Sequence, residues 1–196
     1  MIIRQTSPRI AGKLLLILGP LLCILLTLFV GRYAVSFSGV WGALLGRGSI
    51  EVLTVIWYLR LPRAVAAAFV GASLAVAGTA FQGVFRNPLV NSGILGVNNG
   101  AAFGAALAIV LMGGGVYSYI FAFAFAILAV VMSALAGRVY GSSPTVTLVL
   151  GGVIISSLFG SLTSLLKYLA NPYTQLPAIT FWMMGSLASV GYTHLV

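Results

Sequence analysis

Long apolar runs alternate with short polar segments along this chain, and the lengths of the runs predict membrane-spanning helices. A helix needs about 20 apolar residues to cross a ~30 Å hydrocarbon core. Residues 100–112 form a shorter apolar run, and 179–187 contain the start of a further helix. We expect an all-α transmembrane bundle, with about five complete spans and a partial sixth. The four longer runs are 14–30, 61–81, 117–135 and 146–166.

The connections between the runs carry helix-breaking and polar residues. Residues 33–58 mix Gly, Ser, Arg47 and Glu51 with apolar positions, so we expect an external loop that carries a short amphipathic or re-entrant helix. Pro62 would stand in the first turn of the following span, where its missing N–H costs nothing. Three glycines at 113–115 predict a tight turn before the next span.

Small residues recur every four positions on three of the expected spans. This spacing lets helix backbones approach closely in lipid. The third stripe is partly polar, so it either packs against a neighbouring helix or lines a passage, and its pattern leaves both interpretations open. The three sets are Ala67, Gly71, Ala75 and Thr79; Gly100, Gly104 and Ala108; and Gly152, Ser156, Gly160 and Ser164.

One polar segment, FRNPLVNSGILGVNNGAAFG at 85–104, interrupts the apolar chain and holds four of its five asparagines. Asn87 and Pro88 should end a helix, because the residue before a proline disfavours the α conformation. We expect irregular backbone over 87–99, whose polar groups near the membrane need partners. The amides of Asn87, Asn91, Asn98 and Asn99 can donate and accept, which indicates a structural re-entry segment. A plain polar loop would not account for the short span that follows.

Composition supports the membrane interpretation. Hydrophobic residues make up 61% of the 196 residues and charged residues 6%, whereas a soluble domain has about 25% charged residues. The net charge of +9 comes from ten basic residues and one acid, Glu51. The basic residues border apolar runs singly, which indicates loops at a lipid membrane rather than a nucleic-acid surface. Cys23 stands alone in an apolar run and indicates neither a disulfide nor a metal site.

The basic residues also bear on orientation. Arg4, Arg9 and Lys13 precede the first span, which carries no cleavage signal, and Arg32 closely follows it. This favours a cytoplasmic N-terminus in a cell membrane. Arg60 and Arg63 then carry charge on the outer side, as a docking site for an acidic partner would need. In this orientation the numbers of basic residues on the two sides of the membrane are equal. Those inside are Arg4, Arg9, Lys13, Arg86 and Arg138, and those outside are Arg32, Arg47, Arg60, Arg63 and Lys167.

The chain lacks the residue types of an active site. It has one histidine (His194), one cysteine and one carboxylate, none of them neighbours in the sequence. Catalytic dyads, triads and carboxylate-rich metal sites need more than this, so we expect neither an enzyme nor a bound cofactor. The spans have no interior charge, which argues against a secondary transporter. A channel, a structural membrane subunit and a permease driven by a separate ATPase remain.

From Arg60 onward the chain carries ordered motifs that closely resemble the FecCD family of ABC importer permeases. The family includes cobalamin and iron-siderophore permeases. The resemblance covers residues 60–187. Its motifs here are R-x-P-R at 60–63, G-x-x-L-A-x-x-G at 71–78, Q-x-x-x-x-N-P-L at 82–89, L-G-V-x-x-G-A at 95–101, L-x-G-x-x-I at 150–155 and W-x-x-G-S at 182–186.

The resemblance implies a homodimer, or a heterodimer with a paralogue, of subunits with about ten spans, each of about 20 apolar residues. A cytoplasmic ATP-binding subunit would drive it, and an extracytoplasmic substrate-binding protein would deliver a metal chelate. Ferric siderophore is the first expectation, with cobalamin and haem as alternatives. Arg60 and Arg63 would meet acidic residues of the binding protein. The competing interpretation of these arginines is interfacial anchoring.

The resemblance also suggests roles for the fifth span. The stripe of Gly152, Ser156, Gly160 and Ser164 would face the translocation path, and the loop 141–147 would form a cytoplasmic gate through Ser142, Ser143 and Thr145. Family members are longer, and their ATPase-coupling helices lie in the second half. We therefore expect 1–196 to be one permease domain, a fragment or natural truncation that does not transport alone. A non-transporting membrane subunit is the competing interpretation.

Overall fold

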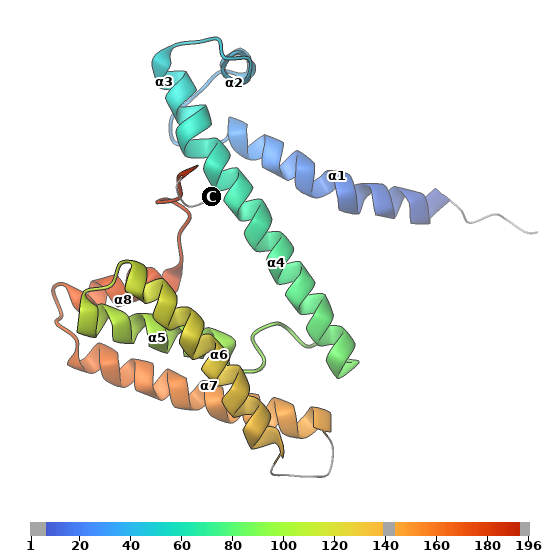
Figure 1. The fold of residues 1–196 in the computed structure, drawn as a ribbon. Helices are drawn as coiled ribbons and strands as arrows, with labels where there is room; N and C mark the ends of the chain where they lie inside the picture. Colours follow the sequence, from blue (N-terminus) through green and yellow to red (C-terminus); the bar gives the residue numbers. More distant parts are fainter. Residues whose placement is uncertain (1–6, 139–143, 193–196) are drawn as a thin grey trace, which may run out of the picture. The chain divides into compact units, whose positions relative to one another are not determined.

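The computed structural model describes residues 7–138 and 144–192, and every regular element in these ranges is a helix. This confirms the all-α expectation. The chain divides into two compact units, Met1–Ser73 with Leu187–Val196 and Leu74–Ser186, and α4 contributes to both (Figure 1). The helices are α1 (Ser7–Phe29), α2 (Phe37–Leu44), α3 (Ile50–Leu53), η1 (Thr54–Arg60), α4 (Leu61–Phe85), α5 (Val97–Met112), α6 (Val116–Arg138), α7 (Pro144–Leu169) and α8 (Gln175–Met184).

In the first unit, the helix that carries the two arginines begins well before the expected position. The segments α3, η1 and α4 follow one another directly, from Ile50 to Phe85. The expected external loop at 33–58 does contain a short helix, α2. For the second half of this range the prediction of a loop is wrong, because the chain is helical from Ile50 onward. Ser49 starts this helix by accepting the Val52 N–H on its hydroxyl, and Glu51 in the first turn favours the positive end of the helix dipole.

Pro62 accordingly lies inside a long helix and not in a first turn. A proline within an α-helix has no N–H to donate, and its ring crowds the carbonyl one turn back. Here a π-helical stretch, η1, immediately precedes it, and the Leu61 N–H bonds to the Ile56 carbonyl, five residues earlier. The wider π turn accommodates the proline, whose side chain is fully buried.

A small apolar core holds this unit together. Val40 and Ala43 of α2 and Ile56 of η1 are fully buried, and Leu28 at the end of α1 packs with them. The Trp57 indole N–H donates to the Ala43 carbonyl at 2.8 Å, which ties η1 to α2. The core therefore joins the end of α1, α2 and the π-helical stretch.

The second unit is a bundle in which α5, α6 and α7 lie side by side, with α8 against α5 (Figure 1). Small residues make the close contacts. A Cβ added at Gly104 would lie 2.3 Å from the Phe121 carbonyl oxygen, and one at Gly100 would lie 2.6 Å from that of Phe125. The stripe at 100–108 thus forms the α5–α6 contact. By contrast, no described atom outside its own helix lies within 4 Å of a Cβ added at Gly71 of α4.

The helix lengths agree with a multi-pass membrane protein. Within residues 7–138 and 144–192, four helical stretches are long and apolar enough to cross a bilayer, and α5 is a shorter apolar helix. Several boundaries differ from the expected ones: among them, α1 starts at Ser7, α5 starts at Val97, α7 starts at Pro144 within the expected loop, and α8 ends at Met184. Gly185 ends α8 with a φ of 71°, a conformation that glycine adopts without steric cost. The four stretches are Gly12–Phe29, Ile50–Phe85, Val116–Gly137 and Val146–Leu169.

We predict that Gly104→Ala destabilises the protein and that Gly71→Ala does not. The new methyl group at 104 meets backbone, which cannot move aside as a side chain can, and overpacking of this kind costs about 1–3 kcal/mol. At position 71 the substitution meets open space and should be neutral or favourable by up to ~1 kcal/mol. Thermal unfolding of the two variants in the same detergent measures the difference. Equal melting temperatures would contradict the close α5–α6 contact.

Candidate functional site

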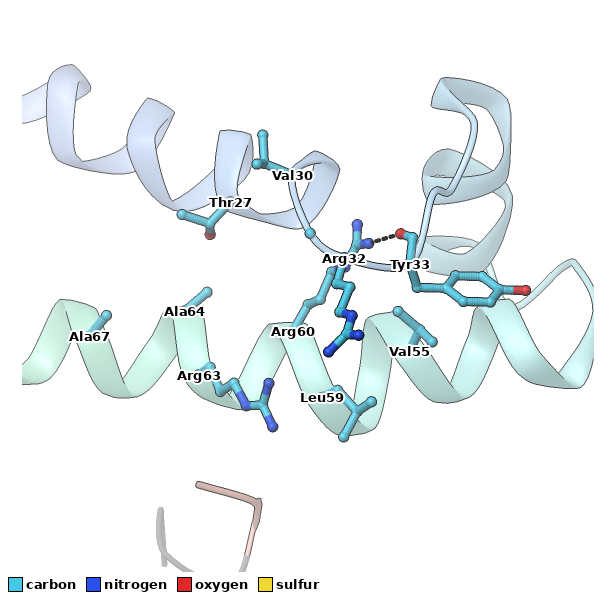
Figure 2. Close-up of a pocket in the computed structure, with 11 residues that line it drawn as sticks. Thr27, Val30, Arg32, Tyr33, Val55, Leu59, Arg60, Arg63, Ala64 and Ala67 are labelled. Carbon is cyan, nitrogen blue, oxygen red and sulfur yellow. Dashed lines mark hydrogen bonds between the residues drawn. The ribbon is translucent and has the colours of Figure 1, made fainter. Parts of the chain in front are cut away.

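Two places collect the residues that the sequence singles out, and each lies within one unit. The first is a cavity of about 390 Å³ in the first unit, between the end of α1, the following loop and the helix from η1 into α4. Figure 2 shows Arg60 and Arg63 on that helix and Arg32 on the loop. All described lining residues other than these three arginines are uncharged.

Arg60 is bound to backbone at the end of α1. Its Nη1 donates to the Leu28 carbonyl at 2.5 Å, and its Nη2 donates to the Tyr33 carbonyl (Figure 2). The last carbonyls of a helix lack partners within the helix, so the guanidinium satisfies a group that would otherwise be unpaired. Gly31 makes room for it, because a Cβ there would lie 2.8 Å from Nη2. Arg60 thus fastens the loop to the helix.

Arg63 follows one turn later and is also half-buried. Its Nη2 donates to the Ala188 carbonyl, which attaches the segment after α8 to the first unit. Its Nε–H is buried and finds no acceptor within the described parts of the chain. The structure therefore brings the two predicted docking arginines together with a third, Arg32, that the sequence analysis counted only as a loop charge. Docking itself stays a prediction.

The chain's one carboxylate does not neutralise these arginines. Glu51 accepts a hydrogen bond from the Tyr33 hydroxyl at 3.1 Å and does not line the cavity. That hydrogen bond, and then the negative charge of Glu51, raise the pKa of Tyr33 above its ordinary value. Glu51 thus bonds to Tyr33 outside the cavity, and the lining of the cavity keeps the positive charge of its three arginines.

The second place is a polar groove of about 430 Å³ in the second unit, between the asparagine-rich segment and α7. Asn91, Asn98 and Asn99 line it from one side, and Ser156 and Ser157 from the other. The Asn99 amide donates to the Ser156 carbonyl at 3.0 Å. Two groups of residues that the sequence predicted separately thus meet here.

The irregular stretch runs over residues 86–96, shorter than expected. The Asn87 and Asn91 side chains accept the N–H groups of Leu89 and Gly93, each at 2.9 Å, in turns typical of asparagine. The Gln82 amide donates to the Pro88 carbonyl at 3.1 Å. The placement of Asn98 and Asn99 in irregular backbone is wrong, because both lie in the first turn of α5. Gly96, with a φ of 78°, ends the irregular stretch immediately before that helix.

The stripe on α7 has two different halves. Gly152 is buried, and a Cβ there would lie 2.1 Å from the Ile94 carbonyl oxygen, so this position packs against the irregular stretch. Ser156 lines the groove. A Cβ added at Gly160 would meet no described atom within 4 Å outside its own helix, and the Ser164 hydroxyl returns to the Gly160 carbonyl. A path along the open half stays a prediction.

The expected gate falls mostly outside the described residues. Ser142 and Ser143 lie there, and for Thr145 the structure describes only the backbone, in the first turn of α7. One residue that the sequence patterns did not indicate is Ser133 of α6, which is fully buried and donates to the Leu95 carbonyl at 2.8 Å. A serine within a mostly apolar span, here one of two with Ser118, is the signal that could have drawn attention to it.

Comparison with known proteins settles the family. The profile of the FecCD transport family matches residues 16–196, which include both places described above. This chain belongs to the FecCD family. The match spans α1 and the short helices as well as the motif region at 60–187, so the family relation extends beyond the motifs.

Individual relatives support this family assignment. A molybdate import system permease protein of Haemophilus influenzae is 37% identical over 98% of this chain and 58% of its own length. A probable iron chelatin transport system permease protein of Helicobacter pylori is 39% identical over 70% of this chain and 41% of its own. A solved structure described as an inward-facing metal-chelate-type ABC transporter superposes with a TM-score of 0.76 at 35% identity, covering 96% of this chain and 57% of the other. The matched parts cover 58%, 41% and 57% of the length of these three proteins, so this chain corresponds to only part of them.

We predict that Ser133→Ala destabilises the protein by about 1 kcal/mol, because it leaves the buried Leu95 carbonyl without its donor. Ser157→Ala is the matched control. Its hydroxyl is exposed and bonds only to the Val153 carbonyl of its own helix, so the change should stay within ~0.5 kcal/mol. Thermal unfolding of both variants tests this, and a Ser133→Ala protein as stable as the control would contradict the role of Ser133 in holding the irregular stretch.

Proposed function

We propose that this chain forms the membrane-spanning permease part of an ATP-driven importer. The family match over residues 16–196 carries the proposal. The partners would be a cytoplasmic ATP-binding subunit, an extracytoplasmic substrate-binding protein and a second permease subunit, identical or paralogous. As a FecCD permease the chain would be a transport subunit, with ATP hydrolysis in the separate ATP-binding subunit.

The proposed cargo is a metal chelate, with ferric siderophore first. A relative named for an iron chelatin and a structural neighbour described as metal-chelate-type support this choice. A relative named for molybdate shows that cargo differs within the family. Cobalamin and haem remain the alternatives. The proposed path runs beside the open half of the α7 stripe, at Ser156, Gly160 and Ser164, with the gate at 141–147.

Uptake by the complete natural protein tests this function. The protein, reconstituted in vesicles with its ATPase and binding protein, should accumulate iron-labelled siderophore only when ATP is supplied. Labelled cobalamin, haem and molybdate, tested in parallel, identify another cargo if one of them is taken up instead. ATP-independent equilibration would indicate a channel, and no uptake of any of the four would favour a non-transporting membrane subunit.

Docking of the binding protein is a separate proposal for Arg60 and Arg63. Arg63→Glu is the better test, because Arg60→Glu would also release the Leu28 and Tyr33 carbonyls and disturb the loop. We expect Arg63→Glu to weaken binding of the substrate-binding protein at least about tenfold, the effect of one charge-assisted contact. Arg47→Glu, an exposed arginine of the same unit outside the cavity, is the control.

Binding of the purified substrate-binding protein to immobilised vesicles measures the effect. Because Arg63 also holds the Ala188 carbonyl, the melting temperature of each variant is recorded alongside. Unchanged docking in a stable Arg63→Glu protein would leave this arginine as an interfacial anchor.

A further inference from the structure

The cavity of the first unit has the chemistry of an anion site. Its described lining includes the guanidinium groups of Arg32, Arg60 and Arg63 and no carboxylate. Arg32 is exposed and makes no hydrogen bond to the described parts of the chain, and the Arg63 Nε–H has no acceptor. Guanidinium groups bind phosphate and carboxylate oxygens through paired N–H donors. An oxyanion would therefore find unused donors here.

The remaining walls of the cavity are mostly apolar. Val30 and Leu59 lie beside the arginines, and Ala64 and Ala67 extend the wall along α4. Val30 is 76% exposed, and Leu21, Leu22 and Leu25 of α1 are also open to the surroundings. Contact with these apolar walls would not stabilise a bound small soluble anion, whereas it would stabilise a bound molecule that has a glycerol backbone and acyl chains.

The cavity also adjoins the end of a candidate membrane span. The stretch Gly12–Phe29 of α1 is a candidate membrane span, and the cavity begins at its end, with Thr27, Val30 and Arg32. Arginine side chains near the ends of membrane helices reach the interface, where the phosphates of the lipid headgroups lie.

We propose that this cavity is a binding site for an anionic phospholipid, with the phosphate among Arg32, Arg60 and Arg63 and the acyl chains along α1 and α4. Arg60 keeps its backbone contacts in this arrangement, since a guanidinium has five donors and only two of its nitrogens face carbonyls. Lipid binding here requires no transport, and a bound phosphate would compete with the proposed docking of the binding protein for Arg60 and Arg63.

Native mass spectrometry of the full chain in detergent tests the site with two lipids of identical acyl chains, phosphatidylglycerol and phosphatidylcholine. We expect retention of one phosphatidylglycerol and loss of phosphatidylcholine. Arg32→Gln should weaken phosphatidylglycerol binding about fivefold, the factor expected for one basic residue near an anionic headgroup. Arg32 makes no hydrogen bond to described residues, so this variant should fold normally, which its melting temperature checks.

Arg47→Gln is the matched control, because it removes an exposed arginine of the same unit that does not line the cavity. Equal loss of lipid in both variants would mean diffuse attraction and would overturn the proposal, as would equal retention of the two lipids. Displacement by millimolar inorganic phosphate would identify a phosphate site without lipid specificity and would also overturn it. Displacement by an acidic peptide but not by phosphate would assign the cavity to a protein partner instead.

Discussion

The second unit depends on a single constraint, the need to satisfy a non-helical backbone in a protein built for lipid. The stretch 86–96 cannot use helical hydrogen bonds, and unpaired N–H and C=O groups are costly where water is excluded. Its partners come from Asn87 and Asn91 within it and from Ser133 of α6. Gly152 lets α7 approach the same stretch closely. This accounts for Asn87 and Asn91, two of the four asparagines gathered between residues 85 and 104.

The same constraint governs the first unit at the end of α1. The Leu28 and Tyr33 carbonyls are satisfied by Arg60, thirty-two and twenty-seven residues further along the chain. From the sequence, this arginine is predicted to be an outer charge available to a partner. In the structure, two nitrogens of Arg60 donate to these backbone carbonyls. An anion in the cavity would therefore bind to the remaining N–H donors of Arg60 and to Arg32 and Arg63.

Run lengths predicted most spans correctly, because membrane thickness imposes the length of an apolar helix. The helix start at Ile50 was not predicted, because a proline such as Pro62 is also typical of the first turn of a helix. The π turn that accommodates Pro62 depends on a hydrogen-bond register that no residue pattern indicates. Four-residue spacing predicted the close contact at Gly100 and Gly104. It could not show that Asn99 meets Ser156, since they lie on separate helices and only their packing brings them together.

The chemistry of the groove bears on how one family carries different cargo. Its polar groups are amides and hydroxyls, from Asn91, Asn98, Asn99, Ser156 and Ser157. Such groups donate and accept hydrogen bonds without imposing a charge on what passes. If the proposed path adjoins this groove, it discriminates little between an oxyanion and a metal chelate. The different cargoes named for similar relatives then require selection elsewhere, which the proposed substrate-binding protein would supply.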